Sequence, residues 1–431
     1  MSENNNKSDI SNEVPSGENS SRNFLRNINT FRSLKNPVYR LYFTGIMGQR
    51  AAMNMQMIAR SYLIYEITGS AAILGVLSIC NALPILLFSV FGGVIADRIH
   101  KKYVLAIGLA GSAVISLAVA LLLTAGYISI DNEGSWWILA VSAVLQGCIM
   151  GLMIPSRQAI IPEIVDEEEI MNAVSLDSTG MNILRLASPA LAGFLVDLFG
   201  YGSVYYVMTG MYIFGTVCII LLPLTGKLSG NATKVLQDIK EGFSYIRRES
   251  TIMLLLIFTL FIVVLSMPYM TLLPVFAEDV LHVGASGMGI LVSVSGLGAM
   301  ISSLTLASLP NKKRGIMLLI SGLVLGLALT AFSFSKAWIL SLIIIVFVGI
   351  GQAGRMALGN TLIQYYVDPN YRGRVMSIYV MNFGLTSFGG ASAGLLTDAL
   401  GPEIGLGAFS IALVVVSIVA LIFLRRIRQL D

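Results

Sequence analysis

The segment that decides the fold is FGGVIADRIHKK, at residues 91–102. It separates two apolar runs, residues 71–91 and 103–127, and each run is long enough to cross a bilayer core of ~30 Å as a helix. The segment itself is therefore predicted to be a very short turn at one membrane face. Positively charged loops stay on the cytoplasmic side, so three basic residues assign the turn to that side: Arg98, Lys101 and Lys102.

This turn resembles the signature G-x-L-A-D-R-x-G-R-K of the major facilitator superfamily of secondary transporters. Ile95 stands in place of Leu and His100 in place of the usual Gly. The resemblance implies that Asp97 is a conformational latch that docks onto the start of the eleventh helix near Arg374, where a helix N-terminus favours a carboxylate. By itself, the segment could also be a stop-transfer charge cluster. The residues that match the signature are Gly93, Asp97, Arg98, Lys101 and Lys102.

Composition places the chain among polytopic membrane proteins. Of its 431 residues, 55% are hydrophobic and 12% are charged, whereas a soluble domain carries about 25% charged residues. The net charge of +4 is modest and the basic residues lie mainly in loops, so no nucleic-acid partner is expected. The three cysteines fall within apolar runs and the two histidines lie far apart, so neither a metal site nor a cofactor is predicted.

Twelve apolar segments predict an all-α fold of twelve transmembrane helices. Each exceeds the ~20 residues that a membrane-spanning helix needs, and only helices satisfy their own backbone groups in lipid. The distribution of Lys and Arg predicts a multi-pass protein of the cell membrane with both termini in the cytoplasm. The predicted spans are residues 39–65, 71–96, 103–127, 136–156, 172–198, 202–225, 251–277, 285–309, 315–335, 337–365, 375–399 and 404–424.

An internal repeat divides these helices into two parallel bundles of six. AGFLVDLFG at residues 192–200 matches AGLLTDALG at residues 393–401, in the fifth and eleventh spans. Parallel repeats are the layout of major facilitator transporters. The predicted organisation is a cytoplasmic tail with an amphipathic segment (1–37), an amino-terminal bundle (38–225), a cytoplasmic linker (226–250), a carboxy-terminal bundle (251–424) and a basic cytoplasmic tail (425–431). The amphipathic segment, residues 22–35, is either a helix on the inner membrane surface or a solvated connector.

Polar residues inside the first span predict one wall of a substrate cavity. An Arg at mid-bilayer costs about 2.5–3.5 kcal/mol unless it faces water or a partner. Gln49, Gln56 and Arg60 share one helical face, and Arg50 and Asn54 share another. Arg50 could instead bridge helices near the inner face.

Two charged residues in the fifth span are candidates for coupling and substrate binding. Asp177 and Arg185 are ~12 Å apart along one helix and cannot pair, so each must face another helix or water. Burial disfavours an ionised carboxylate, which makes Asp177 the candidate proton-coupling residue, with a role at the helix terminus as the alternative. Arg185 is a candidate cavity charge or anion contact, and Arg355 in the tenth span is a further candidate for the cavity.

Further motifs resemble the exporter branch of the superfamily that includes enterobactin and macrolide efflux proteins. They are YEITGS at residues 65–70, RQA at 157–159 and SPALAG at 188–193. The last is similar to the antiporter signature of the fifth helix, with Pro189 and Gly193 on its positions. Another antiporter mark, an Arg four residues before the Gly of the fourth helix, is absent, because Ala143 stands there.

Together the patterns predict a secondary active transporter that carries out proton-driven efflux of small amphiphilic molecules, such as drugs or siderophore-like compounds, by alternating access. The expected partners are a small-molecule substrate, the proton and the lipid bilayer. Uptake by a symporter or uniporter of the same fold is the alternative, and a transporter-derived sensor is less favoured. The sequence offers no nucleophile–base set or phosphate-binding loop, so an enzyme is not expected.

Overall fold

The computed structural model describes residues 29–224, 235–310 and 312–430. Within these ranges the side chains of residues 29–31 and 235–240, and a few within helices, among them Asp97, are not described. The described chain consists of helices and their connections, which confirms the predicted all-α fold.

The first group of helices extends from residue 37 to residue 220. Asn36 caps its first helix by accepting hydrogen bonds from the N–H groups of Val38 and Tyr39, and Gly69 ends that helix in the left-handed conformation. The helices are α2 (Pro37–Thr68), α3 (Ala71–Arg98), α4 (Lys101–Thr124), α5 (Trp136–Ile164) and α6 (Ile170–Ile220), with the short turns η2 (Glu133–Ser135) and η3 (Glu167–Glu169).

The second group extends from residue 250 to residue 428. Its first crossing is composite, because α8 is followed directly by α9 and by a single turn of π-helix, η4 (Phe276–Val280). The helices are α8 (Ser250–Ser266), α9 (Pro268–Val275), α10 (Gly284–Ser308), α11 (Arg314–Ser333), α12 (Trp338–Tyr366), α13 (Arg372–Leu400), α14 (Pro402–Phe423) and α15 (Arg425–Arg428).

These elements account for the twelve predicted crossings. In the described residues, nine helices are long and apolar enough to span a membrane. One of them, α6, contains two crossings, because Gly200 has φ 77° and ψ 171° and turns the chain back. The more polar α2 and α13, of 32 and 29 residues, supply the remaining two.

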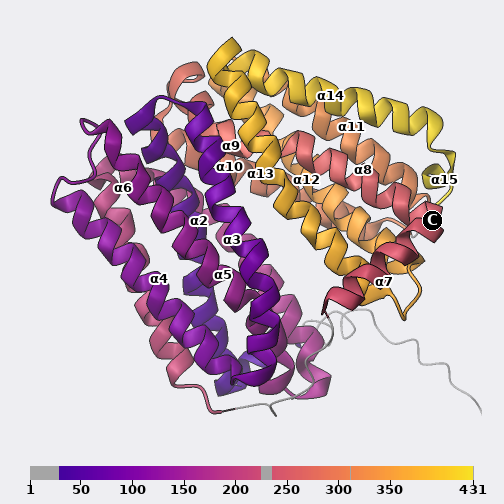
Figure 1. Cartoon of the computed structure of the whole chain (residues 1–431), viewed down its shortest axis with the longest axis horizontal. Coiled ribbons are helices and arrows are strands. Elements are labelled where there is room, and N and C mark those ends of the chain that lie inside the picture. The colour runs from indigo at the N-terminus through magenta and orange to yellow at the C-terminus, as the bar shows by residue number, and fades with distance from the viewer. Residues whose placement is uncertain (1–28, 225–234, 311, 431) are drawn as a thin grey trace, which may run out of the picture.

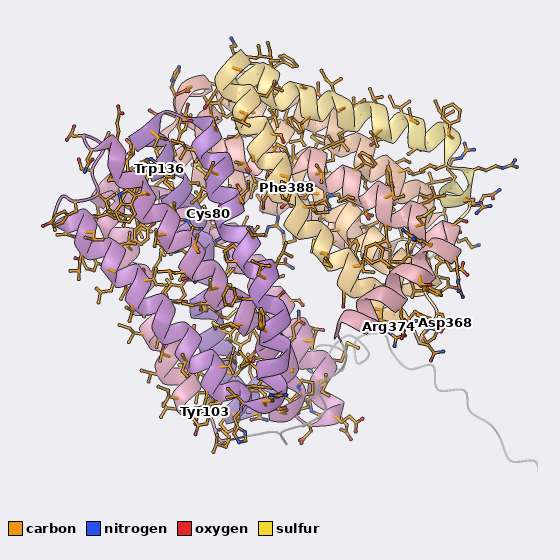
Figure 2. All side chains as sticks on the ribbon, in the orientation of Figure 1. Cys80, Tyr103, Trp136, Asp368, Arg374 and Phe388 are labelled. Atoms are coloured by element: carbon orange, nitrogen blue, oxygen red, sulfur yellow. The ribbon has the colours of Figure 1, made fainter. Side chains whose placement is uncertain are left out.

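The two groups touch at one end of the molecule and separate toward the other (Figure 1). Contacts between the groups run mainly along α3 with α13 and along α6 with α10. We call the end that carries the α3–α4 turn, α7 (Val235–Arg248) and the start of α13 the linker face, and the other end the far face. Cys80 and Phe388 lie where the groups are close, whereas Tyr103 and Arg374 lie at the separated ends (Figure 2).

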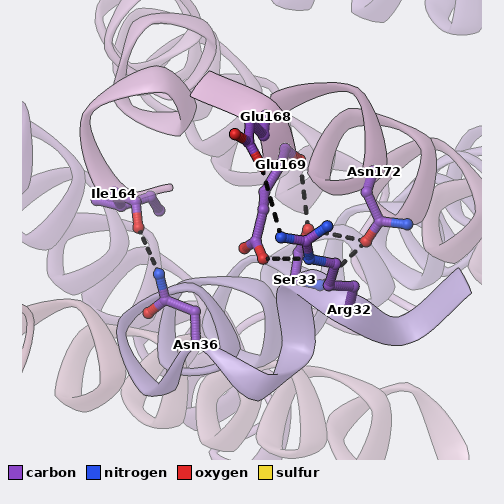
Figure 3. A network of polar contacts seen from close by, with 7 residues as sticks. All are labelled: Arg32, Ser33, Asn36, Ile164, Glu168, Glu169 and Asn172. Carbon is purple, nitrogen blue, oxygen red and sulfur yellow. Dashed lines mark hydrogen bonds and ion pairs between the residues drawn. The ribbon is translucent and has the colours of Figure 1, made fainter. Parts of the chain in front are cut away.

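The amino-terminal segment packs on the first group. From residue 29 it forms a 3₁₀ helix, η1 (Asn29–Lys35), while residues 22–28 of the predicted amphipathic segment lie outside the described range. Arg32 pairs with Glu169 at 3.0 Å, and the Ser33 hydroxyl donates to Asn172 Oδ1 at 2.8 Å (Figure 3). The described part of this segment is thus fastened to the acidic turn before α6.

Candidate functional site

Helices α6 and α10 meet at the far face through the first copy of the internal repeat. A Cβ on Gly193 would collide with the backbone of α10, and a Cβ on Gly289 would collide with the carbonyl of Pro189. One turn after Gly193, Asp197 accepts a hydrogen bond from the N–H of Ser286 at 3.1 Å. The carboxylate therefore caps the N-terminus of α10, whose unpaired N–H groups favour a negative charge.

Helices α3 and α13 meet in the same way through the second copy. A Cβ on Gly394 would collide with the carbonyl of Ala71. Asp398 accepts hydrogen bonds from the N–H of Ala71 at 2.7 Å, the N–H of Ala72 at 3.1 Å and the hydroxyl of Ser70 at 2.6 Å. The repeat thus places one carboxylate of each group on a helix N-terminus of the other group.

Two tyrosines of α2 add contacts between the groups at the far face. The hydroxyl of Tyr62 donates to Glu278, and that of Tyr65 donates to Asp279. Both acids belong to η4 in the second group. The far face is therefore joined by side chains from both pairs of interface helices and from α2.

Toward the linker face, α3 and α13 separate. A Cβ on Gly384 would still collide with the side chain of Leu86, but a Cβ on Gly93 or on Gly373 would meet no atom within 4 Å. The predicted latch between Asp97 and the start of α13 stays a prediction, because the Asp97 side chain is not described. Its expected neighbour Arg374 forms an ion pair with Glu241 of α7, at 3.0 Å.

The basic residues of the α3–α4 turn bind within the first group. Lys101 pairs with Glu163 of α5 at 2.6 Å, and Lys102 donates a hydrogen bond to the carbonyl of Leu222. Arg98 is exposed. These contacts tie the turn to the neighbouring helix ends.

An ion pair inside the first group joins two residues to which the sequence assigned separate roles. Arg50 Nη2 lies 2.6 Å from Asp177 Oδ2, and the side chains are 10% and 15% exposed. Asp177 Oδ1, Arg50 Nε and Arg50 Nη1 are buried with no hydrogen-bond partner. Arg157 of α5 interacts electrostatically with both members of the pair. The carboxylate of α6 therefore lies among two guanidinium groups from α2 and α5.

The other polar residues of α2 are held mostly within the first group. Gln49 is fully buried against two methionine sulfurs of α5, and Gln56 is also buried. Asn54 donates to the backbone carbonyl of Arg50 at 2.9 Å. Arg60 is buried close to Tyr205 and Tyr212 of α6. Gln49, Arg50, Gln56 and Arg60 are thus buried, and the partners described for Gln49, Arg50 and Arg60 belong to the first group.

Arg185 and Arg355 lie on different groups and interact electrostatically across the interface between them. Arg185 lies on α6, next to Leu186, which contacts α10 at Gly296. Arg355 lies on α12, is 2% exposed and interacts electrostatically with Arg185. Tyr269 of α9 is within electrostatic range of Arg185, and Tyr379 of α13 is within range of Arg355. The sequence named both arginines, but their proximity emerges only in the structure.

A pocket at the far face lies elsewhere, between α2, α4 and the region of the Gly200 bend. Leu63, Thr124 and Tyr201 are among its lining residues, and none of the predicted site residues lines it. Neither Arg185 nor Arg355 lines this pocket.

Three features of the site were not predicted from the sequence. Arg157 was named only as part of the RQA motif and Tyr65 only as part of the YEITGS motif, and Tyr62 was not singled out. Asp197 and Asp398 were recognised only as part of the repeat. Their matched place, just before a glycine with positive φ at each helix end (Gly200 and Gly401), is the signal that could have identified them.

The comparison with protein families decides the assignment. The model of the Major Facilitator Superfamily matches residues 42–391 and 281–430. The chain belongs to the major facilitator superfamily. Relatives within this superfamily include the staphyloferrin A transporter of Staphylococcus aureus (strain NCTC 8325 / PS 47), 27% identical over 340 residues that cover 77% of this chain and 82% of the relative.

Two further major facilitator relatives are named as exporters. The enterobactin exporter of Escherichia coli O1:K1 / APEC is 24% identical over 397 residues, which cover 89% of this chain and 90% of the relative. The macrolide efflux protein A of Streptococcus pyogenes is 23% identical over 351 residues, which cover 78% of this chain and 84% of the relative.

Solved major facilitator structures share the fold. The nucleoside transporter NupG superimposes with a TM-score of 0.70 at 14% identity, over 90% of this chain and 99% of its own. A bacterial homologue of the lysosomal transporter Spinster, in an inward-facing and unoccupied conformation, superimposes with a TM-score of 0.66 at 16% identity, over 91% and 96%. As a member of the major facilitator superfamily, the protein is a multi-pass membrane transporter of small molecules.

Proposed function

We propose that the protein is a proton-driven exporter of small amphiphilic molecules that works by alternating access. The observation that carries the proposal is the asymmetry between the two ends: carboxylate caps join the groups at the far face, while α3 and α13 are separated at the linker face. With the linker face in the cytoplasm, as the basic loops predict, this is an inward-open conformation.

Export rather than uptake is supported by the relatives named as exporters, not by the conformation. Relatives named for efflux of a macrolide and export of enterobactin align over most of the chain. One conformation does not fix the direction of net transport, since both directions use the same two states. Uptake by the same fold remains the second candidate.

The Arg50–Asp177 pair supports proton coupling. Asp177 is well buried, has one unpaired oxygen and faces cationic partners. Protonation of its carboxylate would release Arg50 and weaken the tie between α2 and α6, which carries the far-face cap Asp197. A proton taken up here would therefore alter the helix that forms one of the two interfaces.

The test is efflux in a host that lacks its own exporters, loaded in separate runs with an anionic and a cationic dye, with and without an uncoupler. Asp177→Asn removes the charge at nearly constant shape and leaves Arg50 buried without its partner, which costs about 3–5 kcal/mol for a buried pair. We expect uncoupler-sensitive efflux by the wild type and a loss of about tenfold or more in the variant.

Glu133→Gln is the matched control, because Glu133 is an exposed acid in the loop before α5 and should leave efflux unchanged. Both variants need equal amounts of protein in the membrane. Efflux by Asp177→Asn at the wild-type rate, with the same sensitivity to the uncoupler, would exclude this residue from coupling. Dye accumulation driven by the protein would favour the uptake alternative.

A further inference from the structure

We propose that Arg185 and Arg355 form a binding site for an amphiphilic organic anion that carries carboxylate groups. This inference rests on the proposed transport function and narrows its substrate class. It concerns the interface between the two groups, because Arg185 belongs to α6 and Arg355 to α12. A ligand held by both residues would touch both moving parts of the transporter.

The two arginines lack acidic partners. Within the described ranges 29–224, 235–310 and 312–430, neither residue forms an ion pair or a side-chain hydrogen bond, and Arg355 Nε is buried with no partner. They also repel each other, since each guanidinium interacts electrostatically with the other. Two like charges held at an interface without a counter-ion destabilise the protein unless an anion binds there, and Arg355, at 2% exposure, is almost excluded from water.

Four described acids of the interface helices and their neighbours are engaged elsewhere. Asp177, the acid in the interior of the first group, is engaged with Arg50. The caps Asp197 and Asp398 are bound to helix N-termini at the far face, and Glu163 pairs with Lys101 near the linker face. Since no described acid forms an ion pair with either arginine, a bound anion would supply the missing counter-charge.

The surroundings favour an organic anion over a small inorganic one. Tyr269 and Tyr379, which are both buried, interact electrostatically with the two guanidinium groups and give their surroundings an aromatic, apolar character. Guanidinium groups bind carboxylates through two parallel hydrogen bonds, which gives geometric selectivity as well as charge neutralisation. A lipophilic cation would meet the repulsion of both arginines and should bind poorly.

The experiment compares two dyes that share the xanthene skeleton and differ in charge. Binding of carboxyfluorescein, a multivalent anion at neutral pH, and of a cationic rhodamine ester is measured by fluorescence polarisation on the full-length protein in nanodiscs. We expect the anion to bind at least tenfold more tightly than the cation. Arg185→Gln and Arg355→Gln should each weaken anion binding tenfold or more, whereas Arg355→Lys should retain part of it.

Lys336→Gln is the matched control, because Lys336 is an exposed cation at the far face that pairs with Glu403. Its anion affinity should equal that of the wild type. Because Arg355 is deeply buried, its Gln variant could fail to fold, so Arg185→Gln, at a partly exposed position, provides the second test. Each variant is compared only when its elution profile and melting temperature match those of the wild type.

Three outcomes would overturn the anion site: stronger binding of the cation, no binding of either dye, or unchanged anion binding in both Gln variants. The binding assay tests the anion site and the efflux assay in cells tests export, so each proposal can be refuted without the other. An anion that binds through the arginines but is carried inward would preserve the site and refute export. A cation that is exported and bound more tightly would preserve export and refute the site.

Discussion

The two interfaces between the groups are alike at the far face and different at the linker face. In each interface an Asp near the end of one helix caps the N-terminus of the partner helix. Asp398 of α13 caps α3, and Asp197 of α6 caps α10. At the linker face, α3 ends with Asp97 opposite the start of α13, whereas α10 ends with SLP at residues 308–310 and has no acid there. By position, only the α3–α13 pair has at each face an acid at the end of one helix opposite the N-terminus of the other.

This difference suggests that α3 and α13 form the switching interface. They run antiparallel, so each brings an acid to the other's N-terminus, one at each face of the membrane. The described conformation has the far cap engaged, and Gly93 and Gly373, which flank the predicted contact at the linker face, are open. If α3 and α13 tilt about their middle, forming the cap at one face separates the cap at the other. The α6–α10 interface has a cap of this kind at the far face alone among the described contacts.

The largest effect is expected from filling the close contact at the far face. Gly394→Ala would place a methyl group against the carbonyl of Ala71, and overpacking of this kind costs about 1–3 kcal/mol. Since 1–3 kcal/mol corresponds to about 5–150-fold in an equilibrium, the inward-open state should lose population by that factor. After Cys80, Cys148 and Cys218 are replaced, a cysteine introduced at Ser78, which lies between the groups beside Thr271, should become more reactive to a membrane-impermeant maleimide added at the far face.

Gly210→Ala controls for a change of helix propensity, because a Cβ at Gly210 in α6 meets open space. It should leave the labelling rate unchanged. Equal labelling rates in Gly394→Ala and Gly210→Ala would contradict the claim that close helix packing keeps the far face closed.

The two caps are expected to differ in strength. Asp398 accepts from three donors and Asp197 from one in the described contacts, so Asp398→Asn should shift the equilibrium about tenfold, or ~1.4 kcal/mol. Asp197→Asn should shift it by about 0.3–1 kcal/mol, the range for a charge at a helix terminus. The same maleimide assay measures both. A larger shift of the equilibrium in Asp197→Asn than in Asp398→Asn would show that α6–α10, not α3–α13, is the main switching interface.

The smallest effect is expected at the linker helix. The Arg374–Glu241 pair is partly exposed, with side chains 31% and 41% accessible, and such pairs contribute about 0–1 kcal/mol. Glu241→Gln should therefore change the transport rate less than about fivefold. A loss as large as that of Asp398→Asn would show that α7 takes part in gating.

The fold could be predicted from sequence because it depends on local patterns. Apolar length, loop charge and the repeat each specify a helix or its orientation without reference to distant residues. The start of α2 at Asn36-Pro37 and the bend at Gly200 follow the same local logic. The signature at residues 91–102 correctly located the α3–α4 turn.

The site could be predicted only as a set of residues. Spacing along one helix excluded an Asp177–Arg185 pair, but the partner Arg50 depends on how α2 and α6 are rotated against each other. The proximity of Arg185 and Arg355 likewise depends on the packing of two helices from different groups. Helical periodicity gives the face of a residue, not the helix that the face meets.

The most direct test of the switching interface is the distance across the linker face, measured by electron–electron double resonance. Spin labels replace Tyr103 and Tyr365, which are exposed on separate groups, after Cys80, Cys148 and Cys218 are replaced. We expect Asp398→Asn to increase the population at short distance and Asp97→Asn to increase the population at long distance. Shifts of both variants in the same direction, or no shift in either, would contradict the account.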